Sequence, residues 1–299
     1  MVKSLIRAAI VSGLTLVATT GAQAASKELK PFILGYETTG NMTKVVDQVK
    51  DKLKSAGFDI AGSYEPYKGA MVIAVTNQQL KKGAAESKFG GYGAAQRVTL
   101  TEVKGQIQVS YTNPVYMEDA YRMNANYAPV LKELKNALGD KEAYGPKQGL
   151  TASKLRKYHY MFGMEYFTDP SHLAEYDNYK DAVAAVEKGL AEGKGGAHKV
   201  YRIDIPGKNQ TVFGVALTKG CSGDKYIMHN IDFKPIRSTP HLPYEVLVNG
   251  KNVYALYARF RIAINFPDLA MMGHHSFVNI MCAPGAIEKS LTEAAGGKI

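Results

Sequence analysis

The chain has 299 residues, with 37 Lys and Arg against 27 Asp and Glu, two Cys, no Trp, 45% hydrophobic and 21% charged residues. These apolar and charged fractions are those of a folded globular protein, which excludes a disordered or collagen-like chain. Two Cys exclude a disulfide-dense miniprotein and a four-Cys zinc site, and the chain has no Cys-x-x-Cys-His signature for covalent haem. Length alone suggests one or two domains.

The first 24 residues have the order of a secretory signal peptide. Lys3 and Arg7 precede an apolar run at 8–18, and an Ala-x-Ala cleavage site lies at 22–24. The run is shorter than the roughly 20 residues that span a bilayer, and no later stretch approaches that length without charges. The sequence therefore predicts a soluble periplasmic protein without residues 1–24 and without a membrane span.

The chain is basic, with a formal net charge of +10, and loss of Lys3 and Arg7 leaves +8. Such a balance is compatible with nucleic-acid binding, attraction to anionic membranes or steering of acidic partners. We expect no nucleic-acid partner, because the protein is predicted to be exported. Lys residues are spread over helical segments such as 44–54, which is typical of a solvated surface.

The first half shows a series of regular elements. Apolar residues recur at helical spacing over 42–56, and Gly57 ends this helix. Residues 58–63 and 71–76 read as strands, while 98–103 and 107–112 alternate with period two around Lys104-Gly105 and predict a hairpin. A closing helix over 130–138 follows Pro129.

The second half repeats these elements in the same order. Residues 179–190 read as a helix, 200–205 and 211–217 as strands, and 244–248 and 253–265 as a hairpin around Asn249-Gly250, a strong turn signal. Pro284, 155 residues after Pro129, opens a closing helix over 286–295. Extra residues occur mostly around Cys221. Four matched features in one order indicate an internal duplication.

The duplication predicts an α+β fold made of two duplicated two-layer α/β sandwich domains. Each domain would be a mostly antiparallel sheet covered by helices. The predicted boundaries are 25–142 for the first copy, 143–177 for a connector and 178–299 for the second copy.

Three motifs characterise the first copy: Lys54-Ser55-Ala56-Gly57-Phe58-Asp59-Ile60, Val75-Thr76-Asn77 and Val109-Ser110-Tyr111-Thr112-Asn113-Pro114. They resemble the bacterial family "domain of unknown function 302". The second copy is less similar, because it has Phe266-Pro267 in place of Asn-Pro and an insertion around Cys221. The resemblance implies a small two-layer sandwich that often associates through its sheets, and thus a homo-oligomer. It implies no established activity and no catalytic residues.

Both cysteines, Cys221 and Cys282, lie in the second copy. In an oxidising periplasm a lone pair is expected to form a disulfide. The bridge would tie the inserted loop to the start of the closing helix and would remove both sulfurs as metal ligands or nucleophiles.

A group of metal-ligand residue types lies near Cys282. Met271, His274 and His275 would share one face of a helix at i, i+3 and i+4, and thioether and imidazole groups suit copper. The alternative is hydrophobic core, because Met commonly fills cores. The cofactor therefore stays unknown, with copper as the candidate, and we find no nucleotide-binding motif.

The connector contains a dense aromatic run at 156–167. A segment packed between two domains can line a pocket for a small ligand. In that case Arg156 and His159 would be its polar groups, with Tyr158 and Tyr160 beside them. The alternative is that the rings serve only as core or interface.

These observations favour a non-enzymatic periplasmic protein that binds a small molecule or a periplasmic protein near the junction of the two copies. Copper or other metal handling through Met271, His274 and His275 is the second hypothesis. An enzyme of unknown chemistry is the third, because catalytic groups that converge only in space leave no sequence signature.

Overall fold

The computed structural model describes residues 27–298, so the predicted signal peptide, 1–24, lies outside the described residues. The first part contains β1 (Glu28–Leu29), β2 (Phe32–Thr38), α1 (Met42–Ser55), β3 (Asp59–Tyr67), β4 (Ala70–Thr76), α2 (Gln78–Ala85), β5 (Gln96–Val103), β6 (Gln106–Thr112), α3 (Pro114–Ala120) and α4 (Ala128–Leu138). The rest contains β7 (Glu142–Tyr144), β8 (Leu150–Thr151), α5 (Ala152–Arg156), β9 (Ser171–Glu175), α6 (Tyr179–Ala191), β10 (Ala197–Asp204), β11 (Gln210–Leu217), α7 (Asp224–Ile231), β12 (Tyr244–Asn249), β13 (Asn252–Ala255), α8 (Ala258–Asn265) and α9 (Ala283–Ala294).

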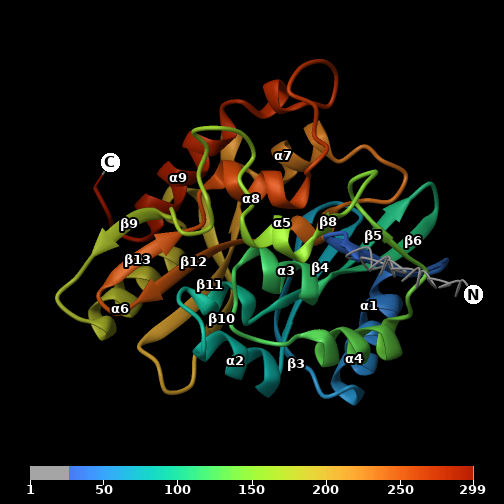
Figure 1. Cartoon of the computed structure of the whole chain (residues 1–299), viewed down its shortest axis with the longest axis horizontal. Coiled ribbons are helices and arrows are strands. Elements are labelled where there is room, and N and C mark those ends of the chain that lie inside the picture. The colour runs from blue at the N-terminus through green and yellow to red at the C-terminus, as the bar shows by residue number, and fades with distance from the viewer. Residues whose placement is uncertain (1–26, 299) are drawn as a thin grey trace, which may run out of the picture.

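Two antiparallel sheets organise the chain. Their strand orders are β3-β4-β5-β6-β2-β7 and β10-β11-β12-β13-β9, and β1 pairs separately with β8. The first five strands of the larger sheet and the five strands of the smaller one therefore follow the same order. The two sheets lie side by side with helices around them, the first sheet in blue and green and the second in yellow to red (Figure 1). The predicted fold class, two related α/β sandwiches, is confirmed.

Equivalent helices in the two halves begin in the same way. The side chain of Asn41 accepts a hydrogen bond from the backbone N–H of Lys44 at the start of α1. Asn178 accepts the same bond from Asp181 at the start of α6. Each bond satisfies an N–H group that has no partner within the helix. Both helices bury a single apolar stripe, as the sequence periodicity predicts.

The expected strand over 253–265 is wrong beyond Ala255. β13 ends there, and residues 258–265 form α8. Seven of the eight residues of α8 are buried, including Arg261 and Asn265. A helix that is buried on nearly every side has no polar stripe, and its sequence resembles that of a buried strand.

The segment predicted as a connector contributes regular structure to the second sheet. Its residues 171–175 form β9, which pairs with β13. β2 holds the equivalent place beside β6 in the first sheet. The segment also contains α5, which packs against α3 of the first half.

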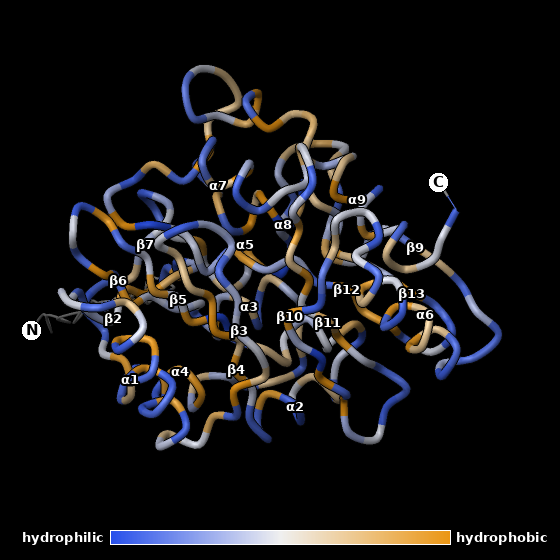
Figure 2. The backbone as a smooth tube through the Cα atoms, turned by 180° about the vertical axis from the view of Figure 1, so that it is seen from behind, coloured by the Kyte–Doolittle hydropathy of each residue, from blue (hydrophilic) through white to orange (hydrophobic). Residues whose placement is uncertain are grey.

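The two halves meet closely along their edge strands β3 and β10. A Cβ atom on Gly62 would lie 2.0 Å from the carbonyl oxygen of Val200, so only glycine permits this approach. The larger hydrophobic core continues across the junction, with Tyr111 from the first half and Leu247 from the second in one buried cluster. Figure 2 shows hydrophobic residues concentrated along the strands, whereas the outer turns are mostly hydrophilic.

A buried ion pair also joins the halves. Nη1 of Arg97 lies 3.5 Å from Oε2 of Glu245, and both side chains are 1% exposed. Arg97 in β5 pairs with Ala74 of β4, as Glu245 in β12 pairs with Gly214 of β11. The two charges therefore occupy equivalent strands of the two sheets.

None of the helices in residues 27–298 combines the length and the apolar character that a membrane span requires.

Candidate functional site

A cavity of about 410 Å³ opens at the junction of the two halves. The first half contributes the turn between β3 and β4 and the end of β5, and the second half contributes the end of α7 and the loop after it. The cavity volume lies within the range of small-molecule sites. Its lining consists of Tyr67, Lys68, Gly69, Thr101, Glu102, Met228, His229, Asp232, Phe233, Arg237 and His275.

The loop that follows α7 is fixed by side chains of the six-stranded sheet, from β6 and β7. Gln108 donates from Nε2 to the carbonyl oxygen of Pro235 at 2.9 Å, and its Oε1 accepts from the backbone N–H of Arg237 at 3.0 Å. The hydroxyl of Tyr144 donates to the carbonyl oxygen of Arg237 at 2.8 Å. These contacts hold one wall of the cavity in place before any ligand binds, which reduces the entropy cost of binding.

Asp232 supplies an unused acceptor to this wall. Its Oδ1 accepts a hydrogen bond from the backbone N–H of Ser238 at 2.9 Å. Its Oδ2 is buried and has no hydrogen-bond partner among the described residues. Burial raises the pKa of the Asp232 carboxyl to about 7, although the bond from Ser238 and the charge of Arg237 oppose the rise. A buried oxygen without a partner is a candidate contact for a ligand.

Arg237 supplies unused donors to the same cavity. Its Nη1 donates to the backbone carbonyl oxygen of Asp232. Among the described residues, no hydrogen-bond partner is found for its Nη2 or Nε. Asp232 and Arg237 therefore give the cavity wall an acidic and a basic side chain that both have hydrogen-bonding atoms without a partner among the described residues.

Two pairs of rings complete the lining. His275 stacks on Phe233 with ring centroids 4.3 Å apart, and Tyr67 meets His229 edge to face at 5.2 Å. The ring of His275 is held by its Nδ1, which lies 3.0 Å from the carbonyl oxygen of Asn230. Such rings can pack against the apolar part of a ligand.

The four predicted ligand-binding residues of the connector do not come together in one site. Arg156 forms an ion pair with Asp119 at 3.2 Å, and this contact joins α5 to α3. Tyr158 and His159 line a shallow depression formed by residues 150–159 of the connector itself, whereas Tyr160 lines a different hollow.

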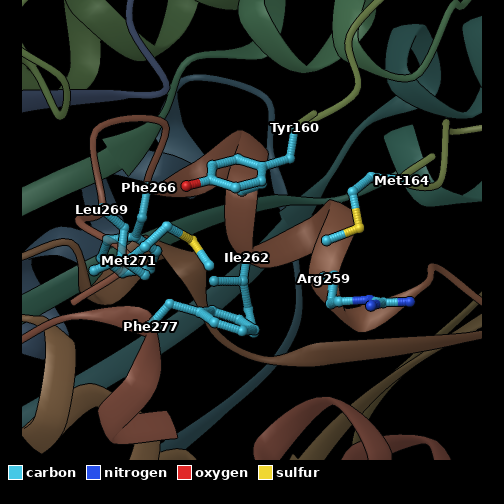
Figure 3. Close-up of a pocket in the computed structure, with 9 residues that line it drawn as sticks. Tyr160, Met164, Arg259, Ile262, Phe266, Leu269, Met271 and Phe277 are labelled. Carbon is cyan, nitrogen blue, oxygen red and sulfur yellow. The ribbon is translucent and has the colours of Figure 1, made fainter. Parts of the chain in front are cut away.

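The hollow beside Tyr160 lies between the connector and α8 and has a volume of about 30 Å³. Met164, Phe266 and Met271 also line it (Figure 3), and the guanidinium of Arg259 points away from the apolar side chains. Arg259 pairs with Glu165 at 2.6 Å. The volume corresponds to about one water molecule, so this hollow is too small for an organic ligand in this conformation.

Exposed hydrophobic residues lie in two segments that contribute to that hollow, 160–166 of the connector and 269–281 after α8. We call "apolar rim" the exposed large hydrophobic residues of these two segments. Phe162 is 100% exposed and Met272 is 77% exposed. The apolar rim consists of Met161, Phe162, Tyr166, Met271, Met272, Val278 and Met281. Exposed apolar surface of this kind often marks a contact with another molecule.

The helical face expected for Met271, His274 and His275 is wrong. Residues 271–276 form a loop, in which Gly273 and His275 have positive φ angles of 101° and 54°. Met271 lines the hollow beside Tyr160, whereas His274 and His275 line a cavity with Asp232. In residues 27–298, no three His, Cys, Asp or Glu side chains are grouped to hold a metal ion. Copper handling therefore stays a prediction without a coordination geometry.

The predicted disulfide is confirmed, since Cys221 and Cys282 are joined. Cys282 is therefore excluded as a copper ligand in this state. The bridge connects the segment before α7 with the residue that precedes α9.

Sequence analysis missed Asp232 and Arg237. A solvated Asp-Phe-Lys-Pro-Ile-Arg-Ser stretch has the composition of an ordinary loop. The sequence offered one signal for this site, which is the insertion between two matched strands of the second copy. α7 and the loop with Asp232 and Arg237 lie in that insertion, between β11 and β12.

No family model, curated protein or solved structure matches the chain. The resemblance to the domain of unknown function 302 therefore stays a prediction.

Proposed function

We propose that the protein is an exported periplasmic binding protein without catalytic activity, and that it holds a small polar ligand in the junction cavity. The signal-peptide pattern and the disulfide support this location. The observation that carries the proposal is a cavity lined by both halves, in whose wall Asp232 and Arg237 retain unused hydrogen-bonding atoms.

The test is native mass spectrometry of the chain from residue 25 onward, after incubation with a small-molecule extract of periplasm. We expect a small adduct on the wild type and its loss from Phe233→Ala, because that change removes the ring on which His275 stacks. Phe162→Ala is the matched control, since Phe162 is exposed and lies outside the cavity. A bare wild-type mass, or equal adducts on all three proteins, would contradict the proposal.

A protein partner is the second candidate function, and the apolar rim favours it. Replacing both Phe162 and Met272 with Ser should abolish cross-linking to that partner in periplasm. The free energy of unfolding should change by less than about 0.5 kcal/mol, because both side chains are exposed. Cross-linking that persists in the double variant would argue against this role of the rim.

A further inference from the structure

We infer that the ligand of the junction cavity is a small zwitterion, whose ammonium group contacts Asp232 and whose carboxylate or phosphate contacts Arg237. This inference rests on the proposed function and specifies the chemistry of the same cavity.

The charges of the lining balance. Lys68 and Arg237 are basic, and Glu102 and Asp232 are acidic; Lys68 and Glu102 are exposed to solvent, whereas Asp232 and Arg237 are partly buried. A ligand with a single charge would pair with only one of Asp232 and Arg237, and partial burial makes it costly to leave the other group unpaired. A zwitterion brings one charge of each sign and pairs with both kinds of group.

Asp232 is suited to an ammonium group. Ser238 occupies Oδ1 and fixes the direction of the carboxyl, whereas Oδ2 has no partner among the described residues. An ammonium group donates three hydrogen bonds and accepts none, so it matches a carboxylate oxygen that lacks a donor. A charge-assisted bond of this type is stronger than a bond between neutral groups.

Arg237 is suited to the acidic end of the ligand. One nitrogen is held by the carbonyl oxygen of Asp232, which orients the guanidinium plane. The other two nitrogens, Nη2 and Nε, lie in the same rigid plane as a fork of donors. This is the geometry that binds a carboxylate or a phosphate through two parallel bonds. Because Gln108 and Tyr144 of the six-stranded sheet fix the backbone of Arg237, this fork keeps its place relative to Asp232.

The backbone brings these two residues to the same wall. Asp232 follows α7 directly, and the bond from the N–H of Ser238 to Asp232 closes the loop between them. Phe233 and His275 form a stacked pair beside them. The part of the ligand between its two charges would therefore pack against these rings.

The experiment is titration calorimetry of the disulfide-bonded protein with each of the twenty free L-amino acids and with phosphoethanolamine. The matching amines without an acidic group, and the matching acids without an amine, serve as single-charge probes. We expect at least one zwitterion to bind and its single-charge probes to bind at least about tenfold more weakly. Asp232→Asn and Arg237→Gln should each lower the affinity for the zwitterion by a similar factor. Lys44→Gln, an exposed lysine on α1, should leave its affinity unchanged.

The outcomes separate the two proposals. If single-charge probes bind as tightly as the zwitterion, the inference is overturned and the binding function stands. The inference is also overturned, and the binding function stands, if no zwitterion binds in calorimetry but mass spectrometry finds an extract ligand on the wild type that is lost in Phe233→Ala. If no zwitterion binds and the extract leaves the wild type bare, both proposals fail.

Discussion

Replacing Arg97 with Met should lower the free energy of unfolding by about 3–5 kcal/mol. The substitution removes the cation beside Glu245, whose side chain is 1% exposed. Glu245 would then be a buried carboxylate with the hydroxyl of Tyr201, at 2.6 Å, as its remaining side-chain partner among the described residues. The bond from Nε of Arg97 to the carbonyl oxygen of Pro240 would also be lost. Guanidinium denaturation of the purified protein measures the change.

A double-mutant cycle tests whether the loss comes from the unpaired charge. Met at both Arg97 and Glu245 should recover most of the stability that either single variant loses, because no buried charge is then left without a partner. Lys44→Gln on the exposed face of α1 is the control and should change stability by less than about 0.5 kcal/mol. Additive losses in the double variant would show that the two side chains do not act as a pair.

The position of this pair explains how a duplicated chain keeps its halves together. Arg97 and Glu245 lie on equivalent strands of sheets that follow the same order. Pairing of two identical copies in this arrangement would bury two Arg or two Glu side chains against each other. Such like-charge contacts are strongly unfavourable in a dry interface. Opposite charges therefore favour contact between a first half and a second half.

The regular elements were predictable where one face is buried and the other is solvated. The stripe of α1 belongs to this class, and the duplication supplied the equivalent elements of the second half. β5 and β6 alternate in sequence as well, but both of their faces are buried, because polar residues such as Arg97 and Thr101 contact the second half. Prediction failed at α8, which is buried on nearly every side. It also missed β9, because edge pairing with β13 depends on a strand about 80 residues later in the chain.

The candidate site was hidden for a different reason. Asp232 and Arg237 acquire their role from bonds to Ser238, Gln108 and Tyr144, of which the last two lie in the six-stranded sheet, far away in sequence. A single sequence contains no signal for such long-range contacts. The connector residues 156–160 were predicted as a site because the segment is rich in aromatic and basic residues. In the fold, however, Arg156 forms an ion pair with Asp119.

A second buried carboxylate predicts how stability depends on pH. Asp224 is 1% exposed, and its Oδ2 accepts hydrogen bonds from the hydroxyl of Tyr64 at 2.7 Å and the backbone N–H of Leu217 at 3.3 Å. Burial nevertheless raises the pKa of Asp224 to about 7. The folded state therefore binds this proton more tightly than the unfolded state, in which the pKa is about 3.9.

We expect the free energy of unfolding to fall as the pH rises from about 4 to 7 and to level off above 7. One such group contributes up to about 1.4 kcal/mol per pH unit in this window. Asp224→Asn mimics the neutral carboxyl, so the variant should lose this part of the slope and gain stability relative to the wild type at pH 8. Glu65→Gln, which removes an exposed carboxyl beside Tyr64, is the matched control.

Denaturant unfolding at pH 5, 6, 7 and 8 measures these slopes. The hydrogen bonds to Tyr64 and Leu217 act against burial, because both stabilise the ionised carboxylate. If they outweighed burial, the pKa would fall below 3.9, and Asp224→Asn would destabilise the protein at every pH in this range. A variant with the wild-type slope and reduced stability at pH 8 would therefore reverse the assignment. It would make Asp224 a charged anchor for Tyr64, rather than a carboxyl that is neutral in the folded state below pH 7.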